Sequence, residues 1–122
     1  MHELSIALSI VEGVEEEMAR LGPARIAAVL LKLGPLSGVV KDALLFSYSV
    51  ACEGTLLAGS KLEIEEVPIV LYCQACRREQ PAISMQCLCC AVCDTPSADI
   101  RAGSELEVFA LELADEQPTA AG

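Results

Sequence analysis

The sequence predicts an α+β fold, in which a small mixed three-stranded sheet packs with two helices and is interrupted by a cysteine-rich insert. Two segments repeat their apolar residues at helical spacing, strand-length segments alternate in polarity, and every cysteine except Cys52 lies between Cys73 and Cys93. At 122 residues and 53% hydrophobic composition, the chain is too apolar for a disordered protein. Its length is that of one domain carrying a small insert.

Two amphipathic segments predict the helices. From Glu3 to Leu21 the opposite face is rich in glutamate, Gly22-Pro23 ends the helix, and the apolar face consists of Leu4, Ala7, Leu8, Val11, Val14 and Met18. In the second segment Ser37 is the expected N-cap and Gly54 the end. The face of that second helix consists of Val40, Ala43, Leu44, Ser47, Tyr48 and Ala51.

Three further segments predict the strands. Arg25–Leu33 is rich in apolar and β-branched residues, which is typical of a mostly buried strand. Lys61–Val67 alternates apolar and acidic residues and therefore predicts a strand with one face in water. Ser104–Leu113 alternates in the same way and is expected to be the last strand.

The cysteine-rich segment between the last two predicted strands suggests a discontinuous domain organisation. We expect one α/β domain from residues 1–67 and 104–114, an insert from residues 68–103, and a flexible tail from residues 115–122. An insert of this size cannot bury a core of its own, and domains this small commonly need a bound metal.

Charge and hydropathy exclude several classes of protein. With 18 acidic and 8 basic residues the net charge is −10, so phosphate backbones and anionic membrane surfaces would repel the chain. The longest apolar run, Ile26–Leu31, is far shorter than the roughly 20 residues that span a bilayer. Acidic residues stand where a secretory signal would carry positive charge. We therefore expect a cytoplasmic protein with no nucleic-acid or membrane partner, in which clustered cysteines bind metal rather than form disulfides.

Two C-x-x-C pairs, Cys73/Cys76 and Cys90/Cys93, have the spacing of a tetrahedral zinc site. Four thiolates leave no open coordination position, so the insert is expected to be zinc-ribbon-like and its metal structural. Spacing alone leaves a second pairing open, because Cys87 and Cys90 also form a C-x-x-C. Cys87 and Cys89 then have no assigned task, although ligand exchange or a second soft metal is an alternative, and Cys52 is expected to be a small buried hydrophobe.

Other functions of the cysteines were weighed against the zinc site. A thioredoxin-type thiol oxidoreductase needs a helix directly after its C-x-x-C, but Pro81 and the absence of an apolar period argue against one here. A nucleic-acid-binding zinc ribbon would need more positive charge than Arg77 and Arg78 supply. A zinc-ribbon interaction or regulatory module is the main alternative to a metal-handling protein.

The N-terminus offers a second kind of metal chemistry. The amine of Met1, backbone amide nitrogens near His2 and Glu3, and the His2 imidazole can close adjacent small chelate rings. Such an all-nitrogen set favours square-planar Ni²⁺ or Cu²⁺. The helix that follows directly would hold these atoms against the domain.

Several motifs together resemble the HypA/HybF family, the nickel-incorporation proteins of [NiFe]-hydrogenase maturation. They are Met1-His2-Glu3 before an amphipathic helix, LKLGPLSGV at Leu31–Val39, the helix containing Phe46, ACEGT, KLEIEEVP, the paired C-x-x-C, and the final ELEV strand. The resemblance extends from Met1 to about Leu113. The chain departs from the family in having Ala91 and Asp94 where Pro and Gly are frequent, and in its extra Cys87 and Cys89.

The resemblance implies a nickel metallochaperone that is not an enzyme. It implies Ni²⁺ as transient cargo on Met1, His2 and Glu3, and structural Zn²⁺ on Cys73, Cys76, Cys90 and Cys93. It also implies a HypB-like GTPase and a hydrogenase large-subunit precursor as partners, and leaves assembly into a homo-oligomer open.

Overall fold

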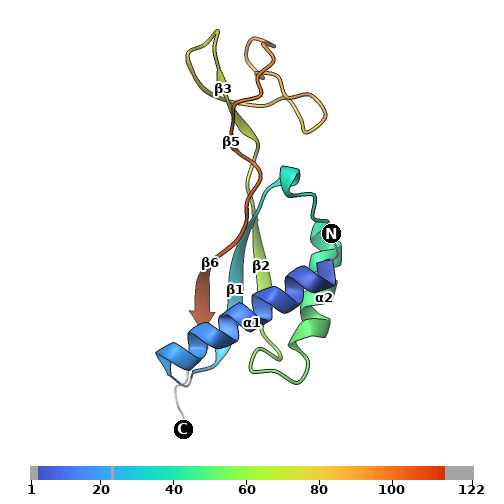
Figure 1. The fold of residues 1–122 in the computed structure, drawn as a ribbon, viewed down its shortest axis with the longest axis vertical. Helices are drawn as coiled ribbons and strands as arrows, with labels where there is room; N and C mark the ends of the chain where they lie inside the picture. The colour runs from blue at the N-terminus through green and yellow to red at the C-terminus, as the bar shows by residue number, and fades with distance from the viewer. Residues whose placement is uncertain (1–2, 23, 115–122) are drawn as a thin grey trace. The chain divides into compact units, whose positions relative to one another are not determined.

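The computed structural model describes residues 3–22 and 24–114, and its elements confirm the predicted α+β class. Two helices and six strands follow one another in the chain (Figure 1). They are α1 (Glu3–Leu21), β1 (Ile26–Leu33), α2 (Lys41–Cys52), β2 (Lys61–Glu66), β3 (Val70–Cys73), β4 (Arg78–Pro81), β5 (Ile100–Ala102) and β6 (Leu106–Leu113). No helix among the described residues is long and apolar enough to cross a membrane.

The first sheet has the strand order β2-β1-β6, so β1 is its central strand. Five side chains of β1 are buried, namely Ile26, Ala28, Val29, Leu31 and Leu33. The edge strand β6 keeps most of its residues exposed, although its sequence alternates as regularly as that of β2. Burial therefore follows the position of each strand in the sheet, as the apolar run of β1 predicted.

Helix α1 packs against α2, and its buried residues form a stripe slightly rotated from the predicted one (Figure 1). Ala7, Val11, Val14 and Met18 are buried as expected, together with Ile6. Leu4 and Leu8, which the helical period placed on the same face, are 44% and 49% exposed. Both predictions were wrong because the period of an isolated helix does not show which edge of a broad apolar stripe meets its neighbours.

The start of α2 also differs from the prediction. Ser37 lies in a short 3-10 turn (Pro35–Ser37), where its hydroxyl accepts a hydrogen bond from Val39 N at 3.2 Å. The N-cap of α2 is Val40, whose side chain cannot accept a hydrogen bond. The Val40 amide instead donates to the Glu3 carboxylate at 3.0 Å, so a side chain from the start of α1 satisfies the start of α2.

The second sheet lies within the cysteine-rich segment and has the order β4-β3-β5. Its strands are antiparallel, with Cys73 opposite Arg78 across β3 and β4. The chain divides into two compact units, of which one contains α1 and α2 and the other contains residues 32–39 and 64–107, including this second sheet. The sequence had predicted no strands in the insert, because each of these strands is too short to show a period.

Two glycines allow a close backbone approach within the second unit. The Leu36 amide donates to Gly103 O at 2.8 Å, and a Cβ on Gly34 would clash with that same carbonyl. A Cβ on Gly103 would lie 2.9 Å from the Cα of Ile69, and Gly103 has a φ of +119°. Glycine at positions 34 and 103 is thus a packing requirement.

Candidate metal centre

The first C-x-x-C forms a tight turn between β3 and β4. Cys73 ends β3, and its Sγ accepts a hydrogen bond from the Cys76 amide at 3.3 Å. The Arg77 amide donates to Cys73 O at 2.7 Å, and Arg77 adopts a left-handed φ of 61°. The turn points both thiols to the same side while the backbone satisfies one sulfur, as metal-binding turns do.

The second C-x-x-C repeats the backbone geometry of the first, but its sulfur accepts from the residue two positions on instead of three. The Val92 amide donates to Cys90 Sγ at 3.4 Å, the Asp94 amide donates to Cys90 O at 2.8 Å, and Asp94 has a φ of 66°. The Cys90 amide donates to Thr95 O at 2.8 Å, which closes the turn from its other end. The two turns therefore share the hydrogen bond to the carbonyl of the first cysteine and the left-handed residue after the second, and each presents two thiols.

These two turns bring the sulfurs of Cys73, Cys76, Cys90 and Cys93 within 4.8 Å of one another. Cys93 Sγ lies 3.5 Å from that of Cys73 and 3.7 Å from that of Cys76, and the sulfurs of Cys76 and Cys90 are 4.0 Å apart. Four sulfurs at about 2.3 Å from a central Zn²⁺ would lie about 3.8 Å from each other. The donor set and its spacing fit tetrahedral zinc.

The four thiols differ in their surroundings. Cys73 and Cys90 are fully buried, Cys76 is half-buried and Cys93 is exposed. The Thr95 hydroxyl, 3.1 Å from the sulfur, lowers the pKa of Cys93 to about 6, and desolvation and the neighbouring Cys93 thiol raise the pKa of Cys76 to about 12. With a pKa of about 6, Cys93 is largely a thiolate at neutral pH, the form that binds a metal ion.

A small apolar cluster lies beneath the four thiols. Leu71 is completely buried together with Cys73 and Cys90, and the partly buried Ala82 and Ile100 pack against them. Apart from the cysteines, this cluster consists of a few aliphatic side chains, which fits the expectation that the insert needs a metal.

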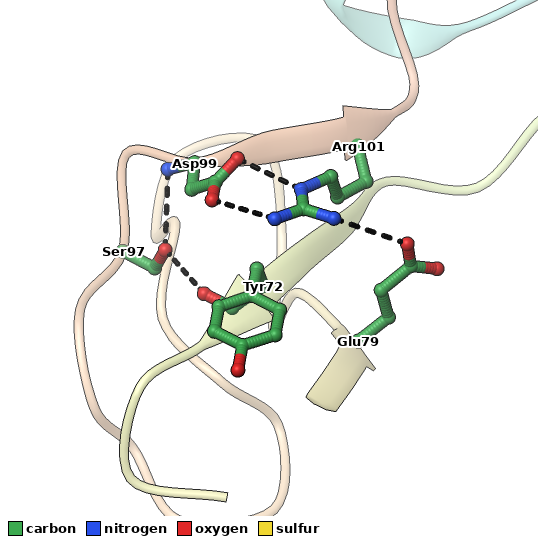
Figure 2. Close-up of polar contacts among 5 residues, drawn as sticks. All are labelled: Tyr72, Glu79, Ser97, Asp99 and Arg101. Carbon is green, nitrogen blue, oxygen red and sulfur yellow. Dashed lines mark hydrogen bonds and ion pairs between the residues drawn. The ribbon is translucent and has the colours of Figure 1, made fainter. Parts of the chain in front are cut away.

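A polar brace ties the three short strands together on one face, from β3 (Tyr72), β4 (Glu79) and β5 (Arg101) (Figure 2). Arg101 donates two hydrogen bonds of 2.9 Å to Asp99, forms an ion pair with Glu79 at 3.5 Å, and lies 4.9 Å from the centre of the Tyr72 ring. The Ser97 hydroxyl donates to Tyr72 O at 2.7 Å and accepts from the Asp99 amide at 3.2 Å. The guanidinium also lowers the pKa of Asp99. No motif in the sequence indicated this brace.

The remaining cysteines lie apart from the four-sulfur group. Cys87, which spacing alone allowed as a partner of Cys90, does not belong to the group, whereas Cys93 does. Cys89 is half-buried like Cys87. Cys52 is buried at the end of α2, as expected for a small hydrophobe, with its sulfur 4.0 Å from the Ser60 hydroxyl.

Of the three N-terminal residues suggested for nickel, the structure describes only Glu3. Met1 and His2 lie outside the described residues. Glu3 occupies the first turn of α1, and one of its carboxylate oxygens holds the Val40 amide. The first turn of α1 is thereby tied to α2.

Comparisons with known proteins agree with this fold. A family model described as hydrogenase/urease nickel incorporation, metallochaperone, hypA matches residues 1–113. A hydrogenase maturation factor HypA from Roseiflexus sp. (strain RS-1) is 48% identical over 120 residues and covers 98% of each chain. One from Chloroflexus aurantiacus (strain ATCC 29366 / DSM 635 / J-10-fl) is 49% identical over 112 residues, covering 92% of this chain and 98% of the relative. The solution structure of the Ni metallochaperone HypA from Helicobacter pylori has a TM-score of 0.65 at 23% identity and covers 95% of this chain and 100% of its own, so it shows the shared fold. With a family model matching nearly its whole length and relatives at close to half identity, the chain belongs to the HypA family.

Proposed function

We propose that this protein is a nickel metallochaperone that binds Ni²⁺ at its N-terminus through Met1, His2 and Glu3 and delivers it during maturation of a [NiFe]-hydrogenase. The observation that carries the proposal is the family match over residues 1–113, which includes these three residues. The relatives are themselves named as hydrogenase maturation factors. Nickel is cargo here, so the protein acts as a carrier and not as an enzyme.

The start of α1 supports the proposal structurally. Because the Glu3 carboxylate accepts from the Val40 amide, the first turn of α1 is anchored to α2. In the sequence, Met1 and His2 directly precede this anchored turn. A chelate built from an amine, amides and an imidazole binds Ni²⁺ tightly, yet protonation or a competing thiolate can dismantle it. Tight binding and ready release are both required of a carrier.

The four thiolates of Cys73, Cys76, Cys90 and Cys93 would hold Zn²⁺, which supplies a cross-link between the two C-x-x-C turns. Two of the sulfurs also accept backbone hydrogen bonds within their own turns. With four protein ligands no position remains for a substrate, and the role is structural. We assign residues 68–103 to this zinc-binding insert, and residues 1–67 and 104–114 to the nickel-binding domain.

Partners follow from the same proposal. A carrier must receive its cargo and hand it on, so we infer a HypB-like GTPase as the first partner and a hydrogenase large-subunit precursor as the second. The net charge of −10 suits a protein that handles cations and disfavours nucleic acid as a partner.

Calorimetric titration of tag-free, zinc-loaded protein with Ni²⁺ tests the N-terminal site. We expect His2→Ala, or any N-terminal extension that blocks the Met1 amine, to abolish tight Ni²⁺ binding without changing zinc content or folding. Glu16→Gln, which removes an exposed carboxylate from the same helix, is the matched control and should bind nickel normally. If His2→Ala binds Ni²⁺ with the stoichiometry and affinity of the unaltered protein, the N-terminal assignment is wrong.

Metal analysis of Cys76→Ser tests the zinc site separately. The variant should lose its zinc and the hydrogen-exchange protection of residues 68–103, while the helical unit stays folded. A variant that retains one zinc per chain would contradict the assignment. A protein that holds zinc but takes up no nickel at all would instead be the zinc-ribbon interaction module considered as the alternative.

A further inference from the structure

The loop between β4 and the second C-x-x-C turn is a small bulged hairpin that carries the two unassigned thiols. Ser84 and Cys87 exchange two backbone hydrogen bonds of 3.2 Å and close the tip, and the Ile83 amide donates to Cys89 O at 2.9 Å. The returning side therefore has one extra residue. The Cys89 amide donates to Cys87 O at 2.8 Å, which draws the two cysteines toward each other.

Cys87 and Cys89 are separated in the sequence by Leu88 alone. Both side chains are half-buried and so remain in contact with solvent, and neither belongs to the four-sulfur group. A metal ion from solution can therefore reach both thiols.

The backbone amides between these thiols donate no hydrogen bond to another segment of the described chain. Within the part of the chain that the structure describes, the Leu88 amide N–H donates to no acceptor. The Cys89 amide donates only inside the tripeptide, to Cys87 O. The Leu88 carbonyl, in contrast, accepts a hydrogen bond from the Ser97 amide at 3.0 Å. This bond to a carbonyl oxygen holds the tripeptide in place. Both nitrogens are thus available without breaking a bond to another segment.

We propose that Cys87-Leu88-Cys89 is a second nickel site, in which two thiolates and the amide nitrogens of Leu88 and Cys89 bind one Ni²⁺ in a square plane. Along the tripeptide the donors follow in the order sulfur, amide nitrogen, amide nitrogen, sulfur, and each neighbouring pair closes a small chelate ring around the ion. Square-planar coordination with nitrogen donors is typical of Ni²⁺ and Cu²⁺, whereas Zn²⁺ prefers a tetrahedron such as the four-sulfur group. Binding releases two thiol protons and two amide protons, and no electron is transferred.

The choice of nickel rests on the proposed function, since a nickel carrier meets this ion as its cargo. The location does not rest on it, because the tripeptide lies far along the chain from Met1 and His2. A thiolate site within the insert would give the cargo a second position on the same chain.

The test uses zinc-loaded protein with an N-terminal extension, so that the Met1 amine cannot bind nickel, kept reduced with a phosphine under anaerobic conditions. Titration with Ni²⁺ should give one further equivalent bound, thiolate-to-nickel charge-transfer absorption in the near ultraviolet, and the diamagnetism of a square-planar ion. Cys87→Ser/Cys89→Ser should lose all three signals. Cys52→Ser, which removes the buried thiol at the end of α2, is the matched control and should keep them.

Three results would overturn the proposal: no charge-transfer bands, bands that persist in the double variant, or bands accompanied by release of an equal amount of zinc, which would place nickel on the four-sulfur group. Failure of the proposed function is distinguishable from all of these. In that case the extended and the native N-termini would bind the same number of nickel ions, whatever happens at Cys87 and Cys89.

Discussion

Replacing Asp94 with glycine should tighten zinc binding, because Asp94 adopts a backbone conformation that L-residues disfavour. Its φ is 66°, in the left-handed region, and the Asp94 amide must hold this position to donate to Cys90 O. The left-handed conformation costs an L-residue on the order of 1 kcal/mol, and glycine adopts it without that cost. Since the turn must form to hold the metal, this energy should appear in zinc affinity as about a fivefold gain.

The assay is competition for zinc with a chromophoric chelator at fixed pH, comparing Asp94→Gly with Asp94→Ala. Alanine removes the same carboxylate but keeps the Cβ, so the difference between these two variants isolates the backbone term. Ala91→Gly is the control within the same turn, because Ala91 has no positive φ and its amide is bonded to Pro81 O at 2.9 Å. There glycine should weaken zinc binding, since it only adds flexibility to the metal-free chain.

Two results would refute this reasoning. If Asp94→Gly binds zinc no more tightly than Asp94→Ala, the left-handed conformation is not a cost in this turn. If Ala91→Gly tightens zinc binding as much as Asp94→Gly does, the gain comes from flexibility and not from φ.

Three further predictions concern single contacts. Thr95→Val should raise the pKa of Cys93 above about 6 in metal-free protein, measured from the pH dependence of alkylation. Because folding lowers that pKa from 9.0, the Cys93 thiolate contributes stability that is fully present above pH 9.0 and is lost as the pH falls through about 6. Thr95→Val should flatten this pH dependence of the unfolding free energy in denaturation experiments. Tyr48→Phe removes a 2.7 Å hydrogen bond to Ser60 and should cost about 1 kcal/mol of unfolding free energy near neutral pH. Burial raises the pKa of Tyr48, so the unaltered protein should lose stability above about pH 10 more steeply than this variant. Leu44→Ala empties a fully buried position and should cost about 2–5 kcal/mol in a urea titration, and a loss below about 1 kcal/mol would contradict its core position.

The helices and the long strands were predictable because their signals are local. The period of α1, the apolar run of β1 and the turn at Gly54 each lie within a few neighbouring residues. The errors arose where a distant residue decided the outcome. Ser37 has the chemistry of an N-cap, but α2 starts later because the Glu3 carboxylate satisfies the Val40 amide across 37 positions of sequence.

The cysteine group shows the same division between local and distant information. Cys87/Cys90 and Cys90/Cys93 have the same spacing, so no local property separates them. In the structure the choice follows from contacts on both sides of Cys90: a β-bridge to Ala82 sets the returning chain, and the Thr95 carbonyl accepts the Cys90 amide. The Cys87 backbone closes the hairpin tip, and its thiol is not part of the four-sulfur group.

The residues that support the metal centre from outside could not have been found in the sequence at all. Nothing in the sequence distinguishes Thr95 from a threonine without a role, and only its 3.1 Å approach to Cys93 gives it an effect on the thiolate. Arg101 lies at a bulge between the two paired positions of β5. It reaches Glu79 across β3 because the strand order β4-β3-β5 places β4 and β5 on either side of that strand. In an insert with so small an apolar core, contacts of this kind must hold the short strands in register. Sequence spacing can therefore nominate ligands, but the order of the strands decides which ligands meet and which residues assist them.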